Sequence, residues 1–231
     1  MTTILGLRAD RGKKVNQGII LGSDISITHT EWKEKGSLAV KELTKSGFQK
    51  MKGSRDGRFI IGTAGVYDNN YYIFLDKLLT GKYDVEKIIA EKDFQEFREL
   101  NINRWGREFP NGQEVNEFLI ASRFDNKPKL HRVFPLGKVE EYTWCVIASG
   151  SPHVTDYFKV NDHSTPYQTM NQGIDLMDGA LSYANKDIYT VGFDIAVVRP
   201  ENIKHFIREI QSTYSKAKKD IIKTIKAKVR D

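Results

Sequence analysis

Pairs of short apolar segments joined by polar turns constrain the fold of this chain more than any other feature. Thr3–Leu7 is a mostly apolar run that leads, through a polar stretch with a central glycine, into a second run, Gly18–Ser23. Phe118–Phe124 is likewise followed by a turn at Asp125–Pro128 and a return segment at Lys129–Pro135. Short apolar runs bounded by turn residues are typical of strands, and short connections between them indicate hairpins. We therefore expect largely antiparallel sheets.

Further strands and several helices complete the predicted order. The other strands are Phe59–Gly65, Tyr142–Ala148 and Phe193–Val198. The helices are Tyr71–Leu79, one or two pieces within Val85–Trp105, Tyr167–Ala184, and a last helix from about Glu201. Because hairpins and helices form separate groups, the order predicts the α+β class. A four-layer α/β/β/α sandwich of two largely antiparallel sheets with outer helices fits it, as do other α+β arrangements.

The positive charge of the chain lies mainly at its C-terminal end. The 231 residues carry 36 Lys and Arg against 30 Asp and Glu, while residues 201–231 alone carry nine against four. A chain of this length favours one domain. We predict a domain over residues 1–200 and a basic amphipathic helix over 201–231, packed on that domain or extending from it. Nucleic-acid binding usually needs a basic groove over the body, so we expect no nucleic-acid partner.

The composition also argues against several protein classes. The longest strictly apolar runs, such as 145–148, are far below the ~20 residues of a membrane-spanning helix, so no membrane association is expected. Met1 leads directly into a strand-like run, which indicates no cleavable signal peptide. A single cysteine, Cys145, fits a cytoplasmic location. The five histidines form no pair at helical metal-ligand spacing, so no metal or other cofactor is predicted.

The first residues offer a candidate nucleophile. Thr2 follows Met1, and methionine aminopeptidases normally remove Met before a small residue. Thr2 would then carry a free α-amine that can act as the base for its own hydroxyl. The ordinary pKa of an α-amine, about 7.7–8.0, leaves a useful neutral fraction near neutral pH. Many chains begin Met-Thr by chance, so this feature needs support from the rest of the sequence.

Six short motifs give that support. They are Thr2–Leu7, Gly22–Asp24, Lys50–Met51, Gly62–Gly65, Ala148–Pro152 and Asp187–Gly192. In this order they resemble motifs of the proteasome β-type subunits, a family of N-terminal-nucleophile hydrolases, over about residues 2–198. The β type is favoured over the α type because no helix is expected ahead of Thr2. The bacterial and archaeal members are the more similar ones.

The resemblance implies a catalytic site built from distant parts of the sequence. The residues implied to take part in catalysis are Thr2, Asp24, Lys50, Ser149, Asp187 and Thr190. Thr2 would be the nucleophile, and the Lys50 ammonium would lower the pKa of its hydroxyl. A buried lysine needs an anionic partner to stay charged, and Asp24 is the candidate. Lys41, Lys45 and Lys52 remain alternatives to Lys50.

The other residues would bind the amine, the oxyanion and the substrate. By resemblance, Ser149, Asp187 and Thr190 would form a hydrogen-bond network around the terminal amine. The backbone N–H of Gly65 would face the oxyanion. Thr63, Phe48 and Lys52 would lie near the specificity pocket.

The implied activity is that of a threonine-type endopeptidase. Thr2 Oγ would attack a peptide carbonyl, and the resulting ester would be resolved by water or, in transpeptidation, by an amine. The implied partners are peptides or unfolded proteins as substrates, further copies of the chain in a homo-oligomeric ring, and an ATP-dependent unfoldase or cap. The alternative is a catalytically inactive ring subunit with a scaffold or regulatory role.

Overall fold

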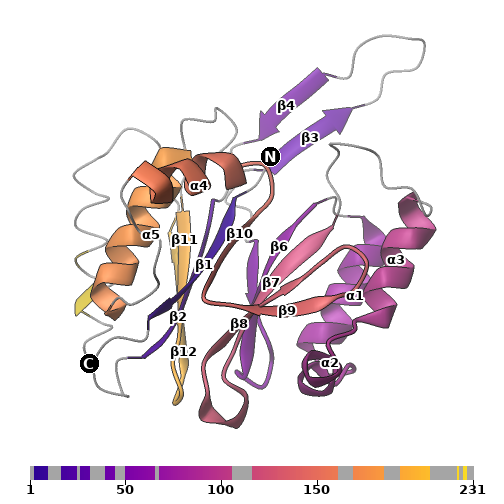
Figure 1. Ribbon diagram of the computed structural model, residues 1–231. Helices are drawn as coiled ribbons and strands as arrows, with labels where there is room; N and C mark the ends of the chain where they lie inside the picture. The colour runs from indigo at the N-terminus through magenta and orange to yellow at the C-terminus, as the bar shows by residue number, and fades with distance from the viewer. Residues whose placement is uncertain are drawn as a thin grey trace.

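The computed structural model describes residues 3–9, 17–24, 27–31, 40–44, 50–65, 68–105, 116–160, 169–184, 193–208, 223 and 226–227. Within these residues, two five-stranded sheets pack face to face, and helices cover the outer side of each (Figure 1). This arrangement confirms the α+β class and the four-layer α/β/β/α sandwich predicted from the sequence.

The first sheet has the strand order β10-β1-β2-β11-β12. Its strands are β1 (Ile4–Ala9), β2 (Gly18–Ser23), β10 (Trp144–Ile147), β11 (Phe193–Val198) and β12 (Ile203–Arg208). All neighbouring strands are antiparallel. The predicted pair β1 and β2 lies in the interior of this sheet, between β10 and β11.

The second sheet is also antiparallel throughout, with strands in chain order. Its strands are β5 (Met51–Gly53), β6 (Phe59–Ala64), β7 (Glu117–Ser122), β8 (Lys129–Val133) and β9 (Val139–Tyr142). The predicted hairpin of β7 and β8 is confirmed, with a short 3₁₀ turn at Phe124–Asn126 between the strands. A separate two-stranded ribbon, β3 (Ile27–Glu31) with β4 (Val40–Thr44), projects from the sandwich (Figure 1).

The helices form the two outer layers. Those on the second sheet are α1 (Asn69–Leu79), α2 (Val85–Glu91) and α3 (Gln95–Trp105), and those on the first are α4 (Ser151–Val160) and α5 (Met170–Ala184) (Figure 1). Asp68 caps α1 by accepting the N–H of Tyr71, a favourable start for a helix.

Three apolar cores hold the four layers together. Successive residues of β1 point to opposite faces of the sheet: Leu5 belongs to the core under α4 and α5, whereas Ile4 belongs to the core between the two sheets. The third core, under α1–α3, is aromatic, and the Phe97 and Phe118 rings meet edge-on with centroids 4.6 Å apart. Burial on both faces explains why the strands read as continuous apolar runs.

The C-terminal prediction needs correction. The sequence predicted a helix from about Glu201, but Ile203–Arg208 form β12, which pairs antiparallel with β11. A tight turn makes this possible, because the N–H of Arg199 donates to the carbonyl of Asn202 at 2.8 Å. Beyond β12, the described residues 223, 226 and 227 are helical.

Candidate active site

Asp24 and Lys50 form a buried ion pair between the two sheets. Asp24 directly follows β2 and Lys50 directly precedes β5, and their side chains are 0% and 1% exposed. The Lys50 Nζ lies 2.6 Å from Asp24 Oδ2. Taking both charges out of water is costly unless the pair is close and its other polar positions are satisfied. The predicted partnership of Lys50 with Asp24 is confirmed.

The second carboxylate oxygen of Asp24 is hydrogen-bonded to the backbone of Thr3. The Thr3 N–H donates to Asp24 Oδ1 at 2.6 Å, and the Asp24 N–H donates back to the Thr3 carbonyl at 3.1 Å. The antiparallel register of β1 and β2, with Ile4 opposite Ser23, brings these two residues together. Asp24 therefore binds both the start of β1 and the Lys50 ammonium.

The backbone of Lys50 is fixed from the second sheet. The carbonyl of Lys50 accepts the N–H of Thr63 at 3.0 Å and the Thr63 hydroxyl at 3.2 Å. This continues the pairing of β5 with β6, in which Met51 lies opposite Gly62. Because Asp24 comes from one sheet and Lys50 from the edge of the other, their ion pair depends on how the two sheets stack.

Gly150 lies directly against the side chain of Thr3. A Cβ added at Gly150 would sit 1.8 Å from Thr3 Oγ1, so no larger residue fits there without a shift. The preceding residue, Ser149, is half-buried in the turn between β10 and α4. The turn begins at Ala148, which has a φ of +76°. The structure thus brings the predicted Ser149 turn to the same end of β1 as Asp24 and Lys50.

Gly65 ends β6 in a conformation that favours glycine. Its φ is +118°, and an added Cβ would lie 2.2 Å from Asn116 Oδ1. L-residues rarely adopt such a φ, so both backbone and space require glycine here. The close approach of Asn116 to Gly65 was not predicted from the sequence.

The two described residues of the predicted specificity pocket have different surroundings. Thr63 is 3% exposed, and its hydroxyl points to the Lys50 carbonyl, so it offers little surface to a ligand. Lys52 is half-buried, and its Nζ lies 5.5 Å from the centre of the Tyr72 ring on α1. Four further predicted site residues lie outside the described residues: Thr2, Phe48, Asp187 and Thr190.

A second charged pair lies near this end of the sheets. Glu117, the first residue of β7, contacts Arg132 of β8, with Oε2 2.6 Å from Nη2 and 3.0 Å from Nε. Burial alone would lower the pKa of Arg132, but the charge and hydrogen bond of Glu117 raise it. Sequence reasoning missed this pair. Glu117 is the one charged residue of β7, but β8 also carries Lys129 and His131, so the sequence does not single out Arg132 as its partner.

The chain matches no model of a known protein family, and no curated protein is significantly similar to it in sequence. No group of three or more His, Cys, Asp or Glu side chains in the described ranges is arranged to hold a metal ion. None of the helices described is long and apolar enough to cross a membrane.

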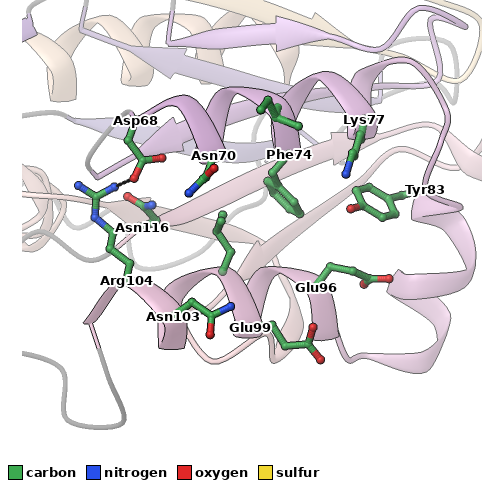
Figure 2. A pocket seen from close by; sticks show the side chains of 12 residues that line it. Asp68, Asn70, Phe74, Lys77, Tyr83, Glu96, Glu99, Asn103, Arg104 and Asn116 are labelled. Atoms are coloured by element: carbon green, nitrogen blue, oxygen red, sulfur yellow. Dashed lines mark hydrogen bonds and ion pairs between the residues drawn. The ribbon is translucent and has the colours of Figure 1, made fainter.

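A cavity of about 480 Å³ is lined by residues of α1 and α3, beside the aromatic core in which the two helices meet. Figure 2 shows Asp68 and Arg104 joined at one end of it, close to Asn116, with Lys77 and Tyr83 toward the other end. The lining mixes carboxylates, amides and cations, so it favours no single class of ligand. Neither Asp24 nor Lys50 lines this cavity, but Asn116, which packs against Gly65, does.

Another cavity, of about 820 Å³, lies beside β8 and β9 and includes His131 in its lining. The His131 side chain is almost fully buried, and its Nδ1 makes no hydrogen bond within the described part of the chain. Burial lowers the pKa of His131 to about 4. This histidine is thus neutral at neutral pH.

Proposed function

We propose that the chain is an N-terminal threonine endopeptidase of the proteasome β type, with Thr2 as its nucleophile. One observation carries the proposal: a fully buried Lys50–Asp24 pair is hydrogen-bonded to the N–H of Thr3, the residue covalently joined to Thr2. Structural stability alone gives little reason to keep such a pair, since apolar residues of similar volume are often as stable. A cation held next to a nucleophile gives a chemical reason.

The ion pair has a defined electrostatic role in this reaction. Burial alone would favour the neutral form of Lys50, and the Asp24 carboxylate at 2.6 Å favours the ammonium. In the proposed site, a charged Lys50 beside the Thr2 hydroxyl would lower the pKa of that hydroxyl and stabilise the negative charge that develops on it. Asp24 would thus act on the chemistry through Lys50 and through the anchored amide of Thr3.

The reaction proceeds by acyl transfer once Thr2 is the first residue. The Thr2 α-amine takes the proton from Oγ, and Oγ bonds to the substrate carbonyl carbon. By the resemblance, the N–H of Gly65 would stabilise the oxyanion, and Ser149, Asp187 and Thr190 would form the hydrogen-bond network of the amine. The peptide C–N bond then breaks, and the proton passes to the leaving nitrogen. Water attacks the ester and releases the acid, or an amine attacks it and a new peptide bond forms.

The resemblance also leads us to propose a working assembly. The active form would be a homo-oligomeric ring that acts on peptides or unfolded proteins, with an ATP-dependent unfoldase or cap as a possible partner. Thr63, Lys52 and Phe48 would contribute to its specificity. Light scattering of the purified protein tests the ring, since a monomer would contradict it.

Intact-mass measurement after incubation with a β-lactone or epoxyketone probe tests the activity. We expect a mature chain that begins at Thr2 and gains one probe mass, with the adduct mapping to Thr2. Thr2→Ala should abolish the adduct, and Lys50→Met should slow its formation by about a hundredfold or more while the protein remains folded. Thr2→Ser is the matched control, because it keeps a hydroxyl and a free amine.

Two outcomes would overturn this function. Purified protein that retains Met1 has no free Thr2 amine and cannot use this mechanism. A chain that begins at Thr2 yet forms no adduct favours the inactive ring subunit with a scaffold or regulatory role.

A further inference from the structure

Glu117 connects the second sheet to the turn beside Thr3. Its residue exposure is 9%, and its Oε1 accepts the N–H of Ala148 at 3.2 Å while its Oε2 binds Arg132. Ala148 lies at the end of β10 in the first sheet, and Glu117 begins β7 in the second. A carboxylate that accepts a backbone N–H makes a charge-assisted hydrogen bond, which is stronger than a neutral one. This contact therefore ties the Ala148 turn to the second sheet.

The Ala148 turn has a conformation that needs such support. A φ of +76° is in the left-handed region, which is unfavourable for residues with a Cβ. Both polar groups of Ala148 are held: the N–H by Glu117, and the carbonyl by the N–H and hydroxyl of Ser151 at 3.0 Å and 2.5 Å. The contacts of Ser151 come from the start of α4, whereas that of Glu117 comes from the other sheet.

The residue before Glu117 contacts the second turn of the candidate site. Asn116 packs against Gly65, and in the β6–β7 register Glu117 lies opposite Ala64. Asn116, directly before β7, thus contacts the Gly65 turn, and Glu117, the first residue of β7, holds the Ala148 turn. Gly150, two residues beyond Ala148, packs on Thr3. One short segment therefore sets the spacing between the Gly65 turn and the Ser149–Gly150 turn.

We propose that Glu117 is a positioning residue of the candidate active site, which it serves by holding Ala148 and thereby placing Ser149 and Gly150 beside Thr3. The proposal rests on the proposed function, because the placement matters only if chemistry takes place at Thr2. Glu117 is not expected to touch substrate. Its loss should slow the chemical step and leave probe binding unchanged.

The test combines one measurement that does not depend on activity with one that does. Hydrogen exchange of the peptide containing Ala148 reports whether the turn is held. The maximal rate of probe attachment and the probe concentration for half-maximal rate separate chemistry from binding. In Glu117→Ala we expect exchange at Ala148 and the attachment half-time each to rise about tenfold, with the half-maximal concentration within about twofold of the wild type.

Other variants keep the test specific. Glu117→Gln retains an oxygen that can accept the Ala148 N–H, so it should restore most of the protection and the rate. Glu117→Asp has a side chain one methylene shorter, so its exchange and attachment rates should lie between those of Glu117→Ala and the wild type. It replaces Glu117→Ala in the test if that variant does not fold. Glu141→Gln is the matched control, since Glu141 is a half-exposed glutamate on β9 that pairs with Lys129 at 3.4 Å. It should change neither measurement.

The outcomes distinguish this inference from the proposed function. Unchanged exchange at Ala148 in Glu117→Ala overturns the inference, and so does raised exchange with a wild-type attachment rate. A higher half-maximal concentration with an unchanged maximal rate also overturns it, since it would indicate a binding role. If the wild-type protein itself does not react, the proposed function fails, and the exchange data still show whether Glu117 holds the turn.

Discussion

Two ion pairs of this protein have opposite surroundings. Asp24–Lys50 lies between the sheets with both side chains at most 1% exposed, whereas Asp68–Arg104 lies at the end of the α1–α3 cavity with side chains 39% and 26% exposed. In the buried pair, the two charged groups have lost their hydration, and each is stabilised by the other instead. In the second pair, water still reaches both groups, so the pair contributes little. The burial of an ion pair, rather than its presence alone, therefore indicates that its charges matter for stability or function.

The largest effect is expected when the buried pair is broken. Asp24→Asn keeps an oxygen for the Thr3 N–H but removes the charge that balances Lys50. Removing one partner of a buried pair typically costs about 3–5 kcal/mol, and we expect a loss of stability in this range at neutral pH. Urea unfolding followed by circular dichroism measures it.

The double variant Asp24→Asn with Lys50→Met controls for lost contacts. It removes both charges, so it should be more stable than Asp24→Asn alone. A cost below about 1 kcal/mol for Asp24→Asn would mean that the comparison between the two pairs does not hold.

The Asp24–Lys50 pair could be predicted from the sequence, but the Glu117–Ala148 contact could not. Asp24 and Lys50 were singled out by their resemblance to the proteasome β-type motifs, with Lys41, Lys45 and Lys52 as alternatives for the lysine. The structure shows that Lys50 pairs with Asp24. The contact of Glu117 with Ala148 joins residues in different sheets. It depends on how the sheets stack, and no local pattern records that.

The C-terminal strand was mispredicted for a related reason. Ile203, Phe206, Ile207 and Ile210 recur at helical spacing, so the pattern favoured a helix. Periodicity over so short a run cannot separate a helix from a strand. The segment forms a strand because β11, which pairs with β2 on one side, can also form backbone hydrogen bonds with β12 on its other side.

His131 offers a comparison with the buried ion pair, because it is buried and its Nδ1 makes no hydrogen bond within the described residues. The pKa of His131 in the folded protein is about 4, below its ordinary value of 6.5. As the pH falls from about 6.5 to 4, the unfolded chain binds a proton that the folded chain does not, so stability is lost over this window. The loss at pH 4 should reach about 3 kcal/mol at most.

His131→Leu should remove this contribution. The variant should lose less stability than the wild type between pH 6.5 and 4 in urea unfolding, while the two differ little in slope above pH 7. His153→Leu on α4 is the matched control, since His153 is only half-buried. Parallel curves for His131→Leu and the wild type would contradict the assignment.

The smallest effect is expected at the exposed pair. Arg104→Met removes the cation but keeps most of the side-chain volume, and Asp68 retains its second role as the cap that accepts the Tyr71 N–H at 2.8 Å. We expect a loss of at most about 1 kcal/mol, smaller still in 1 M salt because screening weakens exposed pairs. Asp68→Ala should cost more, about 0.5–2 kcal/mol, because it also removes the cap. If Arg104→Met were as costly as Asp24→Asn, exposure would not be what separates the two pairs, and the α1–α3 cavity would need to be reconsidered as a site in its own right.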